Sequence, residues 1–123
     1  MLDREDPAGS AWQAHAYYEP ARATDGTWYL TLIAVRREVQ GQGRGAALLH
    51  DVEHLLQAQG QRVLLVETSG LPAFARTRTF YTKCGYVEEA RVRDYYAAGD
   101  DMVLFRKVLH ADDVTSNGHA RQR

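Results

Sequence analysis

Apolar and aromatic residues in the first third of the chain fall into two segments that are typical of β-strands. Trp12–Tyr18 carries several aromatic side chains, and Thr27–Val35 is rich in tryptophan, tyrosine and β-branched residues. Such side chains fit the half-buried, pleated surface of a sheet. Turn-forming residues at Glu19-Pro20 and Asp25-Gly26 separate the two segments. The pattern therefore predicts two antiparallel strands with a long connection.

From Gly43 onward the apolar residues follow helical spacing. The predicted apolar face consists of Leu48, Leu49, Val52, Leu55 and Leu56. Gly60 is suited to end this helix in a left-handed conformation. Val63–Val66 is an unbroken apolar run, which is typical of a strand buried on both faces. The order strand, helix, strand predicts a right-handed crossover with parallel pairing.

The second half of the chain predicts another helix and two more strands. After the break at Gly70-Leu71-Pro72, helical spacing continues as far as Gly85. The residues that define this helical face are Phe74, Thr77, Tyr81 and Cys84. Tyr86–Val92 and Met102–Leu109 are predicted strands, joined by a long loop at Asp94–Asp101. The predicted fold class is α/β, with a mixed sheet.

Chain length and composition indicate a single domain and argue against a nucleic-acid or membrane partner. With 123 residues, we expect one domain at 11–109, preceded by a flexible polar lead-in at 1–10 and followed by a disordered polar tail at 110–123. The net charge of -1 argues against nucleic-acid binding. Apolar runs such as Val63–Val66 are far too short to cross a membrane, and the polar start is unlike a signal peptide. Since the single cysteine, Cys84, allows no internal disulfide, we expect a cytoplasmic protein.

The glycine-rich segment Gln40–Ala46 lies between a predicted strand and a predicted helix. The first amides of a helix have no partner within the helix and carry partial positive charge. Glycines let such amides approach a phosphate closely, and Arg44 adds a full positive charge. A helix that merely begins with glycines is the structural alternative.

The kind of phosphate ligand is not settled by the glycines alone. Gly41-x-Gly43-x-x-Ala46 fits the dinucleotide-binding fingerprint in letters, but that motif follows its strand directly, and here 36–40 intervene. A P-loop is excluded because Gly-Lys-Ser/Thr is absent. A nucleotide-binding module of another class stays open as an alternative.

Two blocks of the sequence together resemble the GNAT superfamily of N-acetyltransferases. The first is Ile33-Ala34-Val35, Gln40-x-x-Gly43-x-Gly45 and Ala47-Leu48-Leu49, which is similar to the family's acyl-CoA motif. The second is Phe80-Tyr81-x-x-x-Gly85-Tyr86. The resemblance covers about 11–109. It implies a GNAT-like acyl-CoA N-acyltransferase fold that lacks the family's usual first strand and first two helices.

The resemblance also implies a cosubstrate, acetyl-CoA, and the residues that hold it. The pantetheine arm would lie along the strand at Ile33 and Val35, and the thioester between two parallel strands that separate. The pyrophosphate would rest on the loop formed by Gln40, Gly41, Gln42, Gly43, Arg44, Gly45 and Ala46. The implied activity is transfer of the acetyl group to a primary amine of an unidentified acceptor.

Two side chains are candidates for the proton transfers of that reaction. Tyr81 matches the family's general acid, and an unperturbed tyrosine is protonated at neutral pH; its alternative is a plain core residue. Glu67, at the end of a predicted strand, resembles the base of some members. Glu67 could instead be a solvated strand end or a helix-capping partner, and the base could be a water chain near Thr68 and Ser69.

The loop between the last two strands is a candidate wall of the acceptor pocket. Tyr95, Tyr96 and Asp100 would offer aromatic surface and negative charge to a cationic amine, although an ordinary solvated loop is an alternative. Many family members carry an asparagine after the Glu67 strand, where this chain has Gly70–Phe74. That departure leaves one contact to CoA unassigned.

The segment His50–His54 matches the His-x-x-Glu-His pattern of some zinc proteases. Its helical phase places His50, Glu53 and His54 away from the apolar face, where we expect them to be exposed to solvent. No metal site is expected.

The chain begins almost at the hairpin of the GNAT-like region, so part of one sheet face would lack its usual cover. An uncovered apolar face favours self-association, and we expect a homodimer. The alternative to an active enzyme is a non-catalytic acyl-CoA-binding or regulatory remnant that needs a partner subunit.

Overall fold

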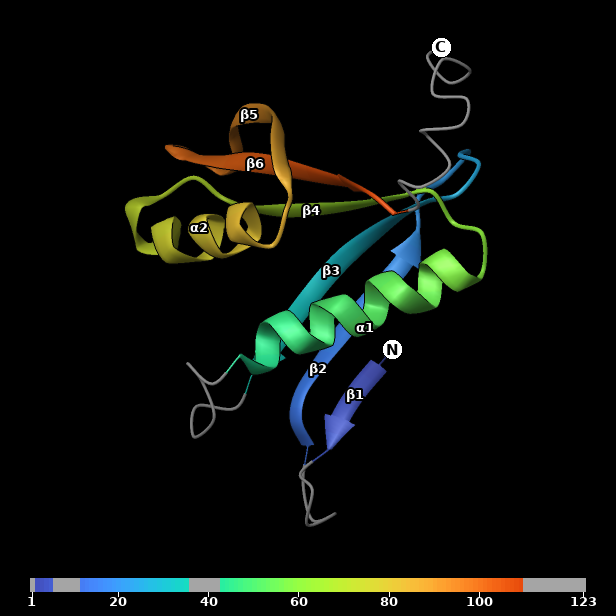
Figure 1. Cartoon of the computed structure of the whole chain (residues 1–123). Coiled ribbons are helices and arrows are strands. Elements are labelled where there is room, and N and C mark those ends of the chain that lie inside the picture. Colours follow the sequence, from blue (N-terminus) through green and yellow to red (C-terminus); the bar gives the residue numbers. More distant parts are fainter. Residues whose placement is uncertain (1, 6–11, 36–42, 110–123) are drawn as a thin grey trace.

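The computed structural model describes residues 2–5, 12–35 and 43–109, with side chains at 16–31 and 43–109. Six strands in this part of the chain form one mixed sheet (Figure 1). In spatial order they are β1 (Leu2–Glu5), β2 (Trp12–Pro20), β3 (Thr27–Val35), β4 (Val63–Ser69), β6 (Asp100–Val108) and β5 (Val87–Ala97). β3 and β4 are parallel, and all other neighbours are antiparallel. The predicted mixed α/β class is confirmed.

The first strand, β1, is not predicted by the sequence pattern. Leu2–Glu5 lies within the expected lead-in, yet its backbone pairs antiparallel with β2 from Leu2↔Ala16 to Glu5↔Trp12. Four residues are too few for a period to be recognised. Its pairing with a separate strand therefore determines this element. The tail expected at 110–123 lies outside the described residues.

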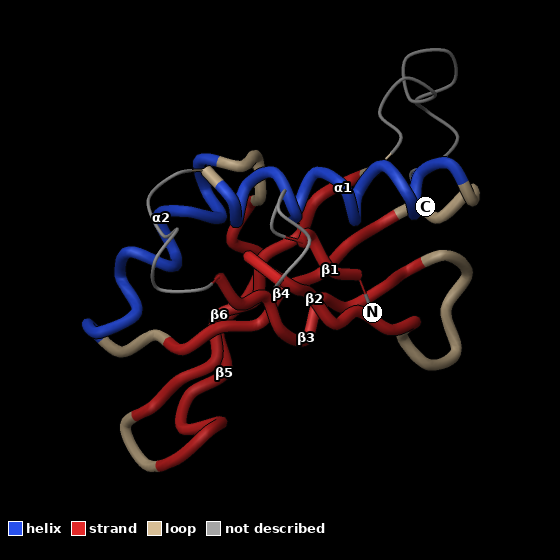
Figure 2. Tube along the Cα trace, turned by 90° about the horizontal axis from the view of Figure 1, so that it is seen from below, coloured by secondary structure: helices blue, strands red, loops and turns tan. Residues whose placement is uncertain are grey.

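Two α-helices lie on the same side of the sheet (Figure 2). They are α1 (Arg44–Ala58) and α2 (Ala75–Lys83), and a short 3₁₀ helix, η2 (Pro72–Phe74), precedes α2. The C-terminal ends of α1 and α2 are alike, because in each a glycine with positive φ follows the C-cap residue. At α1 this residue is Gly60, and at α2 it is Gly85. The predicted helix stops at these two glycines are confirmed.

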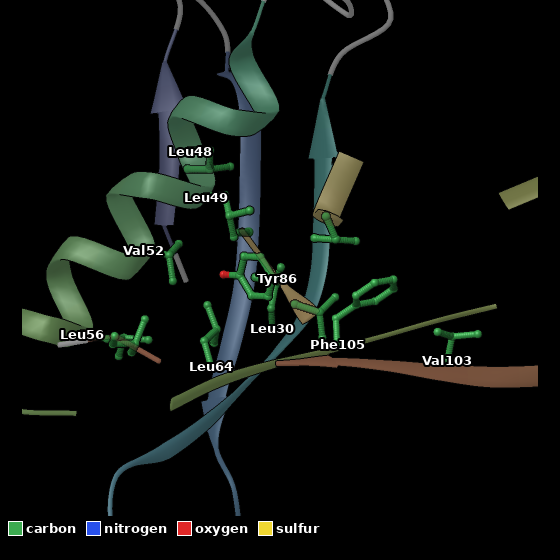
Figure 3. Close-up of a cluster of buried hydrophobic side chains, with 13 residues drawn as sticks. Leu30, Leu48, Leu49, Val52, Leu56, Leu64, Tyr86, Val103 and Phe105 are labelled. Atoms are coloured by element: carbon green, nitrogen blue, oxygen red, sulfur yellow. The ribbon is translucent and has the colours of Figure 1, made fainter. Parts of the chain in front are cut away.

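The core lies between the helices and the sheet (Figure 3). Its largest fully buried side chains are Phe105, Leu48, Leu49, Leu56, Leu64, Val52, Val66 and Val103. Residues of β4 alternate, so that Leu64, Val66 and Thr68 are buried beneath the helices while the residues between them are half-buried. The predicted helix face is correct except at Leu55, which is exposed.

The β5–β6 hairpin differs from its prediction. The expected loop at Asp94–Asp101 is mostly strand, because β5 continues to Ala97 and β6 begins at Asp100. A tight turn at Gly99, where φ is +82°, connects them. The register shifts between Val92 and Ala97, and an irregular strand of this kind has no clear alternating pattern in the sequence.

Candidate functional site

The parallel strands β3 and β4 separate part of the way along their length. Their register runs from Thr27↔Val63 to Leu30↔Val66. Beyond that point β3 continues to Val35 beside β2, and β4 continues to Ser69 beside β6. The ribbons diverge from there (Figure 1). We call this separation the fork, and it is the strand arrangement that the resemblance implied.

The start of α1 leaves polar groups without partners among the described residues. Gly43 caps the helix with φ +77°, and no side chain caps it. The amides of Arg44, Gly45 and Ala46 have no backbone partner in the described part of the chain, whereas Ala47 N–H donates to the Gly43 carbonyl. The space beside Gly43 is open, since a Cβ there would meet nothing within 4 Å. Unpaired amides at an open helix start suit an anion.

Arg44 adds a further unpaired donor to this helix start. Its Nε is fully buried and has no hydrogen-bond partner, and no other described side-chain nitrogen or oxygen shares this state. A buried guanidinium nitrogen without an acceptor is costly unless a ligand supplies one. The residues present therefore fit an anionic group. Gln40, Gly41 and Gln42 lie outside the described residues, as do the side chains of Ile33 and Val35.

Tyr81 lies in an aromatic cluster on the helix-covered face. Its side chain is 4% exposed, and its ring contacts the rings of Phe80, Tyr86 and Phe105 with centroid distances of 5.2–5.8 Å. No described residue forms a hydrogen bond with its hydroxyl group. Burial raises the pKa of Tyr81 to about 12, with a smaller contribution from Cys84. Tyr81 is thus a core residue whose hydroxyl group has no partner in the described part of the protein.

Tyr81 and Glu67 lie on opposite faces of the sheet. Tyr81 packs against Phe105, which is in register with Val66 on the buried face. Side chains alternate along a strand, so Glu67, the next residue of β4, faces the other way and is half-buried. Val66 is also the last β4 residue in register with β3. The two candidate catalytic groups therefore lie on either side of β4 at the point where the fork opens.

The hairpin brings one of its tyrosines close to Glu67. The pKa of Tyr96 is raised, first by partial burial and then by the charges of Glu67, Tyr95 and Asp100. The rings of Tyr95 and Tyr96 meet edge to face at 5.0 Å, and both side chains are largely exposed. Asp100 Oδ1 accepts a 2.5 Å hydrogen bond from the Ser69 hydroxyl. The predicted acceptor residues and the predicted base thus share one region.

Ser69 and Arg78 also belong to this region, although the sequence analysis named Ser69 only beside a water chain and did not name Arg78. Ser69 follows Glu67 by two residues and holds Asp100, while its oxygen also accepts from the Leu71 amide at 3.0 Å. Arg78 Nη1 donates to the carbonyls of Ser69 and Leu71 at 2.7 and 2.9 Å. These bonds fix the turn at which the family's asparagine is missing. A basic residue one helical turn into α2 gives no sequence signal for such a contact.

The prediction that Glu53 is exposed is wrong. Glu53 is 8% exposed, and its Oε2 accepts a 2.6 Å hydrogen bond from the Tyr86 hydroxyl. Its Oε1 accepts from Lys107 Nζ at 3.0 Å, and the same ammonium group donates to the Cys84 carbonyl at 2.9 Å. Burial and the bond to Glu53 raise the pKa of Tyr86 well above its usual range. Glu53 is therefore a buried residue that is held by hydrogen bonds, while His50 is exposed as expected.

Two features are absent from the described part of the chain. Among residues 2–5, 12–35 and 43–109, no three His, Cys, Asp or Glu side chains gather in a group that could hold a metal ion. None of the described helices is both long and apolar enough to pass through a membrane.

Residues 4–88 match the sequence model of the Acetyltransferase (GNAT) domain. The chain belongs to the GNAT acetyltransferase family. This GNAT chain also shares 40% sequence identity, with a TM-score of 0.80, with a crystal structure from Desulfovibrio desulfuricans that is assigned to the same family. The match covers 82% of this chain and 64% of that one. A comparison with curated proteins found no match.

Two other solved structures share the fold at lower identity. The ribosomal-protein-S18-alanine N-acetyltransferase from Escherichia coli has a TM-score of 0.70 at 24% identity, covering 81% of this chain and 63% of that chain. A Bacillus subtilis acetyltransferase in complex with CoA has a TM-score of 0.73 at 21% identity, covering 84% and 73%. The GNAT chain thus spans less than two thirds of the length of the first two structures. The GNAT-like fold that the resemblance implied is confirmed by these matches.

Proposed function

We propose that this GNAT chain transfers the acetyl group of acetyl-CoA to a primary amine at the fork between β3 and β4. One observation carries the proposal: Tyr81 and Glu67 lie on opposite faces of β4 where its pairing with β3 stops. Amine acetylation needs a group that takes a proton from the amine and another that assists the departing sulfur. A reacting carbonyl in the fork would have one such group on each side.

The start of α1 would hold the pyrophosphate of acetyl-CoA. The unpaired amides at Arg44–Ala46 and the buried Arg44 Nε supply donors for an anion. The expected contacts of Gln40, Gly41 and Gln42 belong to the same proposal, as does the pantetheine arm along the backbone of Ile33 and Val35. A CoA complex of a Bacillus subtilis relative with the same fold supports this cosubstrate.

Tyr81 would assist the leaving group chiefly as a hydrogen-bond donor. A thiol has a pKa of about 8.5, while burial raises the pKa of Tyr81 to about 12. Full proton transfer from this tyrosine to a free thiolate would therefore be uphill. A short hydrogen bond from the neutral hydroxyl group still stabilises negative charge on the sulfur as the bond breaks. The proton that the thiolate finally takes up can come from solvent.

Glu67 would accept the proton of the acceptor amine, with the hairpin forming the opposite wall. The charges of Glu67 and Asp100 contribute to the raised pKa of Tyr96, which supports a place for this tyrosine beside the two carboxylates. Aromatic faces beside carboxylates favour a cationic amine over a neutral or acidic acceptor. Tyr95 extends the aromatic surface through its contact with Tyr96.

The test is acetyl-CoA turnover with a panel of small amines and peptides that have free N-termini. Tyr81→Phe and Glu67→Gln should each lower kcat by about 10²-fold, because each removes one proton-transfer or hydrogen-bonding group. Glu19→Gln, on the exposed part of β2, serves as a matched control and should leave kcat unchanged. Unchanged kcat in both site variants would contradict the proposed roles.

A non-catalytic acyl-CoA-binding protein is the second candidate. It is favoured by one observation, that the Tyr81 side chain is 4% exposed and packs in an aromatic cluster, as a plain core residue does. We also propose that the protein is cytoplasmic and forms a homodimer. The dimer is supported by the position of the described α-helices, which lie on one side of the sheet. Acetyl-CoA binding without turnover on any amine would support the second candidate. A monomer in sedimentation at micromolar concentration would contradict the dimer.

A further inference from the structure

The group formed by buried Glu53, buried Tyr86 and half-buried Lys107 has no role in the reaction as proposed above. It joins three separate elements: Glu53 is on α1, Tyr86 follows α2, and Lys107 is on β6. Glu53 accepts from both partners, at 2.6 Å from Tyr86 and 3.0 Å from Lys107. Lys107 Nζ also lies 5.3 Å from the centre of the Tyr86 ring. Each polar atom of the contact has a partner, as a buried charge requires.

Tyr86 contacts Tyr81 through both its backbone and its ring. Its amide donates to the Tyr81 carbonyl at 3.0 Å, within the turn that ends α2. Its ring meets the Tyr81 ring edge to face, at 5.8 Å and 71°. Figure 3 shows the Tyr86 hydroxyl group directed toward α1, where Glu53 accepts its hydrogen bond. A ring held at its far end by a hydrogen bond has little freedom to tilt or slide.

These contacts connect the two halves of the site. Glu53 is on the same rigid helix whose first turn, at Gly43 and Arg44, carries the unpaired donors. Tyr86 joins that helix to the ring of Tyr81, and the Phe105 ring, at 5.8 Å, supports Tyr81 from the sheet. A shift of α1 relative to α2 would therefore move the Tyr81 hydroxyl group relative to a cosubstrate held by α1.

We propose that Tyr86 is a positioning residue for Tyr81, and that Glu53 anchors it to the helix that binds the cosubstrate. The inference rests on the proposed function, since it assigns Tyr86 a role only through Tyr81. Lys107 Nζ pairs with Glu53 Oε1 at 3.0 Å and supplies the opposite charge beside it. Cys84 enters only through its carbonyl group, which Lys107 binds.

The experiment is a double-mutant cycle on kcat with Tyr81→Phe and Tyr86→Phe. Tyr86→Phe keeps the ring and removes only the hydroxyl group, and it should lower kcat about tenfold with an unchanged KM for acetyl-CoA, because misplacement of a catalytic group slows the reaction. In the Tyr81→Phe background the same change should have no further effect on kcat. Tyr18→Phe, a half-buried tyrosine that packs against Trp28, is the matched control and should leave kcat unchanged.

A second measurement does not depend on turnover. In protein labelled with ¹³C at the tyrosine Cζ, the Tyr81 signal is identified by its loss in Tyr81→Phe. Tyr86→Phe and Glu53→Gln should both shift that signal, while Tyr18→Phe should not. If Tyr86→Phe does not fold, Glu53→Gln makes the same test, since it alters the anchor and leaves both tyrosines in place.

The outcomes separate this inference from the proposed function. Additive losses in kcat, or a Tyr81 signal that does not respond to either variant, would overturn the positioning role while leaving the acetyltransferase proposal intact. Absence of turnover in the unmodified protein would overturn the proposed function, and the ¹³C shifts would still decide whether Tyr86 sets the environment of Tyr81.

Discussion

The first turn of α1 and its third turn are built in opposite ways, although they belong to one helix. At the first turn, the amides after Gly43 and the Arg44 Nε have no partner in the described part of the chain. At the third turn, Glu53 is buried and both of its oxygens accept hydrogen bonds. The first arrangement leaves bonding capacity for a ligand, and the second uses it for the fold. A helix can therefore have one end suited to binding and a middle that is fixed by packing.

Mutations in the two turns should therefore affect different properties of the protein. Variants at the third turn should lower stability and spare acetyl-CoA binding. Variants at the first turn should do the reverse.

The largest effect is expected for Lys107→Met. It removes the ammonium group that balances Glu53 and leaves a buried carboxylate without its counter-charge, which should lower the free energy of unfolding by about 3 kcal/mol. Urea unfolding followed by circular dichroism measures this change. Arg106→Met, at an exposed neighbouring position on β6, is the control and should change stability little. Equal stability of the two variants would contradict the proposal that the third turn of α1 serves the stability of the fold.

Gly43→Asp should give the complementary result. The new carboxylate would lie beside the unpaired amides and repel a pyrophosphate, so the Kd for acetyl-CoA should rise by about a hundredfold. Isothermal titration calorimetry measures the change. Gly60→Asp is a closely matched control, because Gly60 follows the same helix, has φ +80° and likewise has nothing within 4 Å of an added Cβ. Similar losses of affinity in both variants would show that strain in the helix, rather than its start, is responsible.

The smallest effect concerns the titration of Tyr81 in alkali. Its pKa is raised from 10.0 in the unfolded chain to about 12 in the folded one. The stability that this shift provides is fully present below pH 10 and is lost as the pH rises through 12. Over that range the free energy of unfolding should fall by up to about 1.4 kcal/mol per pH unit from this group. Tyr81→Phe should flatten the slope measured by urea unfolding between pH 10 and 12, and an unaltered slope would contradict the assignment.

The sequence predicted those helices and strands whose positions follow from local apolar spacing. Thr27–Val35 is a strand with the predicted bounds, and both helices end at the glycines expected to stop them. β4 begins at Val63 as expected but continues to Ser69, because its last residues pair with β6 although they are polar. Local apolar spacing therefore identified where elements begin more reliably than where pairing ends.

What the sequence missed depends on contacts between distant residues. Glu53 was assigned to solvent by helical phase, but it lies at the edge of the apolar face, and its partner Lys107 is 54 residues away. The separation of β3 from β4 came only from the family resemblance, since no residue type marks the place where pairing stops. The candidate site residues that motifs identified lie in the elements expected: Gly43 and Arg44 at the start of α1, and Tyr81 in α2. The contact of Ser69 with Asp100, in contrast, depends on the folded hairpin.

The fork also bears on aggregation through strand pairing. Strand edges with unpaired amides and carbonyls tend to recruit further strands and so promote aggregation. Here the unpaired stretches of β3 and β4 face inward, flanked by β2 on one side and β6 on the other. An extended molecule with regularly spaced amides could pair with these inner edges as an added strand would, whereas the edge of another folded domain would have difficulty entering. The backbone amides and carbonyls of these inner edges are thus accessible to an extended ligand, but not to the sheet edge of another protein molecule.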